Sequence, residues 1–160
     1  ALGLERPGAG RAVWRREATS AAEEVPYLPP ESVFLLDAAH DPATGRTLFA
    51  VARDLFAVLV WTPSGGLRTV EHPGPTRYQP TRVHAWPSRP GVVLVAAYAQ
   101  RADGAWGASL RRFDPAAARF LPGTLALGPG APNRVRVDRR GRVWVLLGWA
   151  GQLLRVGSSD

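Results

Sequence analysis

Basic side chains recur in two short stretches of the sequence, TRVHAW and NRVRVD, at the second and fourth positions of each. They are Arg82 and His84 in the first stretch and Arg134 and Arg136 in the second. Because side chains alternate along a β-strand, all four are expected on one face, with the intervening valines on the other. Guanidinium groups stay charged and offer a planar fork of donors, so this face is predicted to bind carboxylates, phosphates or sulfated glycans.

These arginines also have two interpretations that involve no ligand. They could pair with acidic residues of a neighbouring repeat, or they could reflect coding bias, since all 20 basic residues are arginine. The formal charge of +7 favours anionic partners in either case. The arginines are spread from Arg6 to Arg155 instead of being clustered, which argues against a nucleic-acid-binding surface.

Residue patterns for catalysis or metal binding are missing from the sequence. His40, His72 and His84 have no partner at ligand spacing, and each is expected to be a solvated loop or strand residue. The chain has no cysteine and no GxSxG, P-loop or GxGxxG motif. The sequence therefore predicts no cofactor and no metal site, and it assigns no catalytic residue.

Aspartate and tryptophan residues have both structural and functional interpretations. Asp37 and Asp138 each precede a predicted turn, where a carboxylate can cap the backbone, so both are interpreted as structural. Trp144 lies within an apolar strand and is expected in the core. Trp106 and Trp149 fall near loop ends, where their rings are predicted to stack on a sugar or a base.

The elements that would position these residues repeat along the chain. Gly45, Gly91 and Gly141 each stand before an apolar run, and they are 46 and 50 residues apart. Each glycine belongs to a turn that also contains Asp or Pro, so each repeat is predicted to open with a hairpin. A repeat of this length is typical of the blades of a β-propeller.

Each repeat contains three or four predicted strands. They cover residues 32–37, 46–52, 56–63 and 66–71 in the first repeat and residues 81–86, 92–99, 107–115 and 118–127 in the second. The third repeat has strands at residues 133–138, 142–149 and 152–157. Residues 12–29 are similar to residues 108–122, so the chain is predicted to begin within a repeat.

The repeated motif, an apolar run followed by D-x-x-G-x-V/L-W/F-V, resembles that of NHL-type, two-component-regulator and gluconolactonase-like propellers. The resemblance implies an all-β fold, a β-propeller-like array of four-stranded antiparallel blades, with a β-sandwich or jelly roll as the alternative. Residues 1–11 are assigned to an N-terminal tail and residues 12–160 to a single domain. Within that domain we expect a half blade at 12–31, blades at 32–80 and 81–132, and an incomplete blade at 133–160.

In propellers of this kind, the first strand of each blade lines the channel, and two sets of loops share the rim where ligands bind. The resemblance places polar and aromatic residues on that rim, namely Arg53, Asp54, Arg77, Tyr78, Gln79, Arg101, Asp103, Trp106, Asn133 and Trp149. It implies a module that binds a peptide, glycan or protein through the rim loops, or an anion on an arginine-lined channel side. The alternative is part of a propeller enzyme similar to gluconolactonases or quinoprotein dehydrogenases.

The number of predicted strands bears on assembly and location. About three blades are too few to close a propeller ring, which takes roughly four to eight. We therefore expect a homo-oligomer, or a partner chain that completes the ring and covers the edge strands. No apolar run reaches the roughly 18 residues of a membrane-spanning helix. Because Ala1 comes first instead of Met, removal of a signal peptide, and hence a secreted or periplasmic location, is expected.

Overall fold

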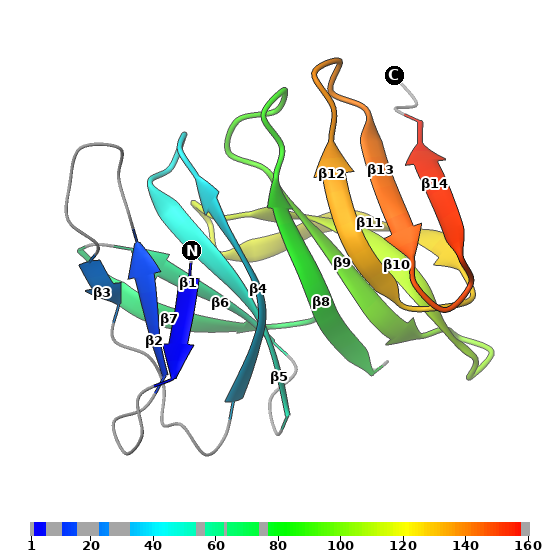
Figure 1. Ribbon diagram of the computed structural model, residues 1–160, viewed down its shortest axis with the longest axis horizontal. Helices are drawn as coiled ribbons and strands as arrows, with labels where there is room; N and C mark the ends of the chain where they lie inside the picture. The colour runs from blue at the N-terminus through cyan, green and yellow to red at the C-terminus, as the bar shows by residue number, and fades with distance from the viewer. Residues whose placement is uncertain are drawn as a thin grey trace.

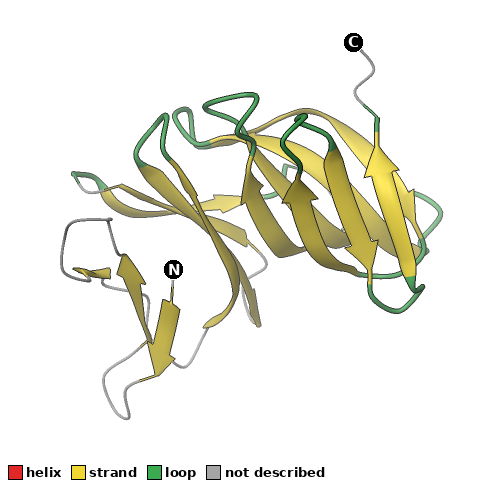
Figure 2. Ribbon diagram, turned by 45° about the horizontal axis from the view of Figure 1, so that its top comes forward, coloured by secondary structure: helices red, strands yellow, loops and turns green. Residues whose placement is uncertain are grey.

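The computed structural model describes residues 2–5, 11–15, 23–25, 33–53, 57–62, 64–73 and 77–157. Every regular element in these ranges is a β-strand, and the strands form four antiparallel sheets (Figure 1). The predicted all-β fold of blade-like antiparallel sheets is thus confirmed, with loops and turns at the ends of the strands (Figure 2). Within these ranges, no helix is long and apolar enough to cross a membrane.

The sheets are meanders, because strands that follow one another in the sequence pair with one another. Sheet A contains β1 (Leu2–Glu5), β2 (Arg11–Arg15) and β3 (Glu23–Val25). Sheet B contains β4 (Val33–Asp41), β5 (Arg46–Arg53), β6 (Ala57–Thr62) and β7 (Gly66–Glu71). Sheet C contains β8 (Tyr78–Ala85), β9 (Val93–Gln100), β10 (Trp106–Asp114) and β11 (Arg119–Gly128). Sheet D contains β12 (Pro132–Val137), β13 (Val143–Leu147) and β14 (Gln152–Val156), and β1 lies within the stretch assigned to a tail.

Aspartates cap the hairpin turns that join the first two strands of sheets B and D. In sheet D, Asp138 Oδ1 accepts hydrogen bonds from the backbone N–H groups of Arg140 and Arg142, at 2.9 and 3.0 Å. In sheet B the corresponding residue is Asp41, whose Oδ2 accepts a hydrogen bond from Thr44 Oγ1 at 2.7 Å. These bonds satisfy polar groups that a tight turn would otherwise leave unpaired. The predicted structural role of Asp138 is confirmed.

The predicted cap at Asp37 is wrong, because β4 continues to Asp41 before the chain turns. Asp37 lies within the strand, and its Oδ2 accepts a hydrogen bond from the Val83 backbone N–H of β8 at 3.1 Å. The carboxylate therefore joins sheet B to sheet C.

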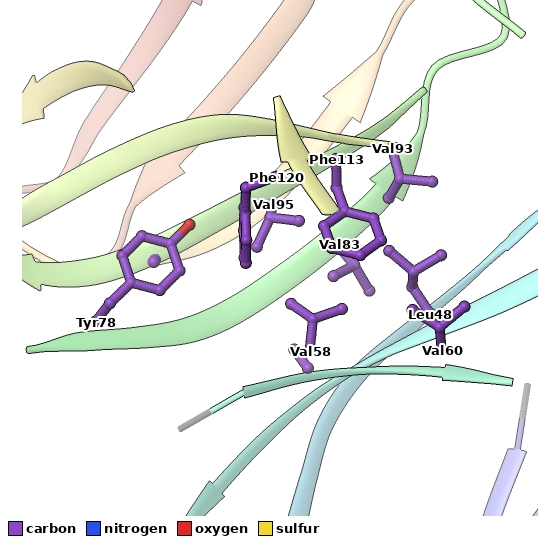
Figure 3. Close-up of a cluster of buried hydrophobic side chains, with 11 residues drawn as sticks. Leu48, Val58, Val60, Tyr78, Val83, Val93, Val95, Phe113 and Phe120 are labelled. Carbon is purple, nitrogen blue, oxygen red and sulfur yellow. The ribbon is translucent and has the colours of Figure 1, made fainter. Parts of the chain in front are cut away.

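Sheets B, C and D stack through apolar faces, and their first strands β4, β8 and β12 lie side by side (Figure 1). Between sheets B and C, Leu48 and Val58 meet Val83 and Phe113 in a cluster of buried side chains (Figure 3). Between sheets C and D, a second buried cluster contains Leu94, Ala96, Leu110, Val135, Val143, Val145 and Leu147. Removal of these faces from water favours the stacking, and the stacking sets the first strands next to one another.

Alternation along β13 divides its apolar residues between two environments. Val143 and Val145 are buried against sheet C, whereas Leu146 is exposed on the outward face of sheet D. Trp144, which was expected in the core, is half-buried, and its Nε1–H donates to Asp138 Oδ2 at 3.1 Å. That prediction is wrong because a run of apolar residues does not reveal which face of a strand has a neighbouring sheet.

The first strands of sheets B, C and D each carry an irregularity of register at the same place. The shifts lie between residues 35 and 37, 80 and 82, and 132 and 134, so the extra residues are Leu36, Thr81 and Asn133. A β-bulge leaves its extra residue outside the regular pairing and re-aims its side chain. Thr81 Oγ1 lies 3.3 Å from Ala96 O and 3.1 Å from Pro132 O, so the bulge residue of sheet C ties β8 to β12.

Candidate ligand-binding site

A cavity of about 360 Å³ lies where the bulges of the three first strands meet. Its lining also includes the connection before β12 and the turn between β13 and β14, at the lower end of sheet D in Figure 1. The lining residues are Leu36, Gln79, Thr81, Arg82, Ala131, Pro132, Asn133, Gly148 and Trp149. All three bulge residues are among them, so the bulges shape the cavity. The sequence pointed to Gln79, Arg82, Asn133 and Trp149.

Arg82 is the charged group of this cavity. Its Nε donates to the Asn133 carbonyl oxygen at 2.6 Å, and one terminal nitrogen donates to Asn133 Oδ1 at 3.2 Å. The other terminal nitrogen donates to the Thr81 carbonyl oxygen at 2.5 Å. All these acceptors are neutral, and none of the ion pairs between described residues involves Arg82. The guanidinium is thus held in place, and no carboxylate of the described residues forms an ion pair with it.

The side-chain amide of Asn133 has a defined orientation. Its oxygen accepts from Arg82, so its Nδ2 group is left to donate elsewhere. The amide packs over Gly148, where an added Cβ would come within 3.2 Å of Asn133 Cβ. The Gly148 N–H donates to the Ala131 carbonyl oxygen at 3.1 Å, which anchors the turn that carries Trp149. The absence of a side chain at position 148 therefore allows the amide and the turn to approach each other.

Trp149, which lines the cavity, belongs to a cluster of three aromatic side chains. The Tyr98 and Trp106 rings stack with centroids 5.0 Å apart, and the Trp149 ring meets Tyr98 edge-on at 5.6 Å. Trp149 keeps 78% of its surface exposed. Tyr98 pairs with Gln79 across β8 and β9, so the two side chains share a face. Tyr98 was not identified from the sequence, although an aromatic residue among the alanines near the end of β9 was a usable signal.

Two further predicted residues, Arg101 and Asp103, form a turn of their own. Arg101 and Asp103 make an ion pair at 2.7 Å, and both are exposed. The hydrogen bond from Arg101, followed by that from the Ala105 N–H, lowers the pKa of the Asp103 carboxyl. These groups satisfy one another in the turn between β9 and β10 and do not line the cavity.

Other predicted site residues lie apart from the cavity. Arg77 is exposed just before β8, and its carbonyl oxygen accepts from the Gln100 N–H at 2.8 Å. Tyr78 is 5% exposed and stacks on His72, with ring centroids 4.1 Å apart. The expectation that His72 is a solvated loop residue is therefore wrong. The Arg53 side chain and the whole of Asp54 lie outside the described residues.

The four basic residues of the two matching stretches are divided between two places. The strand registers put Arg134 and Arg136 at the positions of Arg82 and His84, but both arginines are exposed and neither lines the cavity. His84 is half-buried, and burial, followed by the charge of Arg136, lowers its pKa against the opposing effect of Asp37. The charges of Arg136 and Asp37 thus act on His84, and of the four basic residues only Arg82 lines the cavity.

Metal ligands do not cluster in the described part of the chain, where no three His, Asp or Glu side chains gather closely enough to hold an ion. The cavity offers polar and aromatic groups. It presents a guanidinium, two side-chain amides and a threonine hydroxyl beside an exposed indole.

No protein-family model matches the chain, and no curated protein matches it. A solved structure described as a protein of unknown function from Bacteroides caccae is similar, with a TM-score of 0.40 and 15% sequence identity. The similarity covers 86% of this chain and 62% of that protein, so this chain spans less than two thirds of its length.

Proposed function

We propose that the protein is a ligand-binding module of propeller-like architecture, and that its cavity takes a sugar that carries a carboxylate. The observation behind this proposal is the pairing of an uncompensated guanidinium, Arg82, with the exposed indole of Trp149 in one cavity. A fixed guanidinium suits a carboxylate, since charge-assisted hydrogen bonds are among the strong ones. A flat aromatic face suits the apolar face of a sugar ring. The Asn133 and Gln79 amides are then available to sugar hydroxyls.

We also propose that the chain belongs to the group of NHL-type, two-component-regulator and gluconolactonase-like propellers. Its support is the meander order of the sheets and the alignment of β4, β8 and β12, each with a bulge at the same place. Propeller enzymes of that group are the alternative. The lining of this cavity contains no carboxylate, imidazole or thiol that could serve as a general acid or base, which favours binding over catalysis.

Calorimetric titration with a galacturonic acid trisaccharide, and with the neutral galactose trisaccharide of the same linkage, tests the proposal. The acidic sugar should bind about tenfold more tightly or better, because a charge-assisted hydrogen bond is worth at least that factor. Trp149→Ala and Arg82→Gln should each weaken binding. Arg134→Gln is the matched control, since Arg134 has the same place in its repeat but lies outside the cavity. Equal affinity for both sugars, or full affinity in Trp149→Ala, would contradict the proposal.

A second role, in self-assembly, is favoured by the outward face of sheet D. Leu146 and Leu153 are 36% and 64% exposed there, and they pair across β13 and β14. The equivalent pair in sheet C, Ala96 and Leu110, is buried against sheet D. We propose that a second copy of the chain covers this face. Its strands would supply neutral oxygens to Arg134, as Asn133 supplies them to Arg82.

A further inference from the structure

Buried polar atoms without partners gather in one place, away from the cavity. In the described part of the chain, the buried side-chain atoms that lack a hydrogen-bond partner are His72 Nδ1, Tyr78 Oη, Ser109 Oγ and Arg111 Nε. Most buried polar groups in proteins are paired, and an unpaired one costs free energy. Four such atoms in nearby residues therefore indicate an occupant that the described part of the chain does not supply.

Contacts between the side chains bring these atoms together. The His72 ring stacks on Tyr78 at 4.1 Å and 14°, and a terminal nitrogen of Arg111 contacts His72 Nε2. Phe120 backs the group, with its ring centroid 5.7 Å from that of Tyr78 and 5.2 Å from the Arg111 guanidinium carbon. Tyr78 and Phe120 lie side by side in Figure 3, at one end of the core between sheets B and C.

The strand registers place Ser109 on the same face. Ser109 and Arg111 are two residues apart on β10, so both side chains leave the same side of sheet C. On this face of β9, Ala97 pairs with Ser109 and Ala99 pairs with Tyr78, whereas Val95 pairs with Arg111. The side chains of β9 next to Tyr78 and Ser109 are therefore both small.

The proton positions follow from the contact between Arg111 and His72. A guanidinium can only donate, so His72 Nε2 accepts and the ring proton sits on Nδ1. Burial, followed by the charge of Arg111, lowers the pKa of His72 to about 4, so the ring is neutral at pH 7. Burial also raises the pKa of Tyr78, which keeps its hydroxyl protonated. The unpaired atoms are thus two N–H donors and two hydroxyl groups that can donate.

The Arg111 guanidinium places a positive charge in this cluster, and none of the other three residues carries a negative charge. Its remaining contacts are the Leu121 carbonyl oxygen at 3.4 Å and the face of Phe120. No ion pair of the described residues includes it. A partly buried cation without a counter-charge is costly, and a bound anion would offset that cost.

We propose that His72, Tyr78, Ser109 and Arg111 form a binding site for a small oxyanion, a carboxylate or a phosphate group. The oxyanion accepts from His72 Nδ1, Arg111 Nε and the hydroxyl groups of Tyr78 and Ser109, and it neutralises the guanidinium. A water molecule could satisfy some of these donors but would leave the charge unchanged. The site is independent of the cavity, because none of the four residues lines it.

Titration of the intact protein with sodium acetate and sodium phosphate tests the site, against sodium chloride at equal ionic strength. NMR spectra of the histidine rings report on it directly. Saturable binding should raise the His72 pKa from about 4, because a nearby anion favours the imidazolium form. The acetate and phosphate arms distinguish the two kinds of oxyanion.

Three variants complete the experiment. Tyr78→Phe keeps the stacked ring and should weaken anion affinity about tenfold, as expected for one lost hydrogen bond to a charged group. Arg111→Met should abolish binding. Arg112→Ala is the control, since that neighbour is exposed and donates to the Pro122 carbonyl oxygen at 3.0 Å, away from the four residues of the site. No saturable shift of the His72 signals in the wild type, or equal affinity in Tyr78→Phe, would overturn the proposal even if Arg111→Met fails to fold.

Discussion

Arg82 and Arg134 occupy the same position in successive first strands, but Arg82 bonds to the first strand of the next sheet, whereas Arg134 has no such bond among the described residues. Arg82 donates to the carbonyl and side-chain oxygens of Asn133, whereas Arg134 is exposed on the outward face of sheet D. Arginine at this position of the repeat thus bonds two sheets together in one case and is a charge on the protein surface in the other.

This difference predicts unequal effects on stability. Arg82→Ala removes the bonds to Asn133 and Thr81, so the free energy of unfolding should fall by about 1–3 kcal/mol. Arg134→Ala should stay within about 0.5 kcal/mol of the wild type, as surface substitutions do. Urea denaturation followed by tryptophan fluorescence measures both. Similar values for the two variants would mean that Arg82 does not tie sheet C to sheet D in solution.

Acid should weaken the hairpin of sheet D through Asp138. Partial desolvation opposes ionisation, but hydrogen bonds from Trp144, Arg142 and the Arg140 N–H outweigh it and hold the pKa well below its usual range. A depressed folded-state pKa contributes stability above the unfolded pKa of about 4, and that contribution is lost as pH falls further. Asp138→Asn should therefore lose less stability than the wild type between pH 5 and pH 2, in thermal melts at matched ionic strength. Parallel curves for the two proteins would exclude this role.

His72 should make stability depend on pH in a different window. Its folded-state pKa of about 4 lies below the unfolded value of 6.5, so unfolding takes up a proton between these values. Stability is then fully present above pH 6.5 and falls as pH drops toward 4. His72→Gln should reduce this slope without removing it, since the pKa of His84 is also lowered. Chemical denaturation in amine buffers, which contain no small oxyanion, provides the measurement; an unchanged slope would argue against a neutral, half-buried His72.

The outward face of sheet D should mediate self-association. We expect sedimentation velocity at micromolar concentration to detect species larger than the 17.2 kDa monomer. Leu153→Arg should shift the protein toward monomer, because it places a charge in the exposed apolar pair. Leu125→Arg is the control, since Leu125 is 45% exposed on β11 of another sheet. A monomeric wild type, or equal effects of both substitutions, would count against association through this face.

Much of the secondary structure was predictable because its signals are local. Alternating side chains located β12 within one residue at each end, and turn residues located the hairpin that Asp138 caps. The wrong prediction, that Asp37 caps the first turn of sheet B, came from the same local reasoning. Two aspartates, Asp37 and Asp41, stood near one turn, and the sequence did not show that β4 runs on to the second.

The candidate site was predictable in part. Arg82, Asn133 and Trp149 were identified because polar and aromatic residues at strand starts and loop ends stand out in an apolar repeat. Leu36 and Thr81 were not, because a bulge has no distinct residue pattern and depends on how a strand pairs with its neighbour. Tyr78 was placed on the rim, although its ring is buried in the core between sheets B and C.

By itself, the sequence determined the order of strands and turns, the repeat of about 50 residues and the excess of arginine, since each depends on residue type and near neighbours. The stacking of the sheets decided which arginine is bonded and which is exposed, which histidines are half-buried and where the bulges meet. Those outcomes depend on contacts between residues about 50 positions apart, such as Arg82 with Asn133 and Asp37 with Val83. Alternation and turn chemistry carry no information about such distant partners, because burial and charge compensation are properties of the packed sheets.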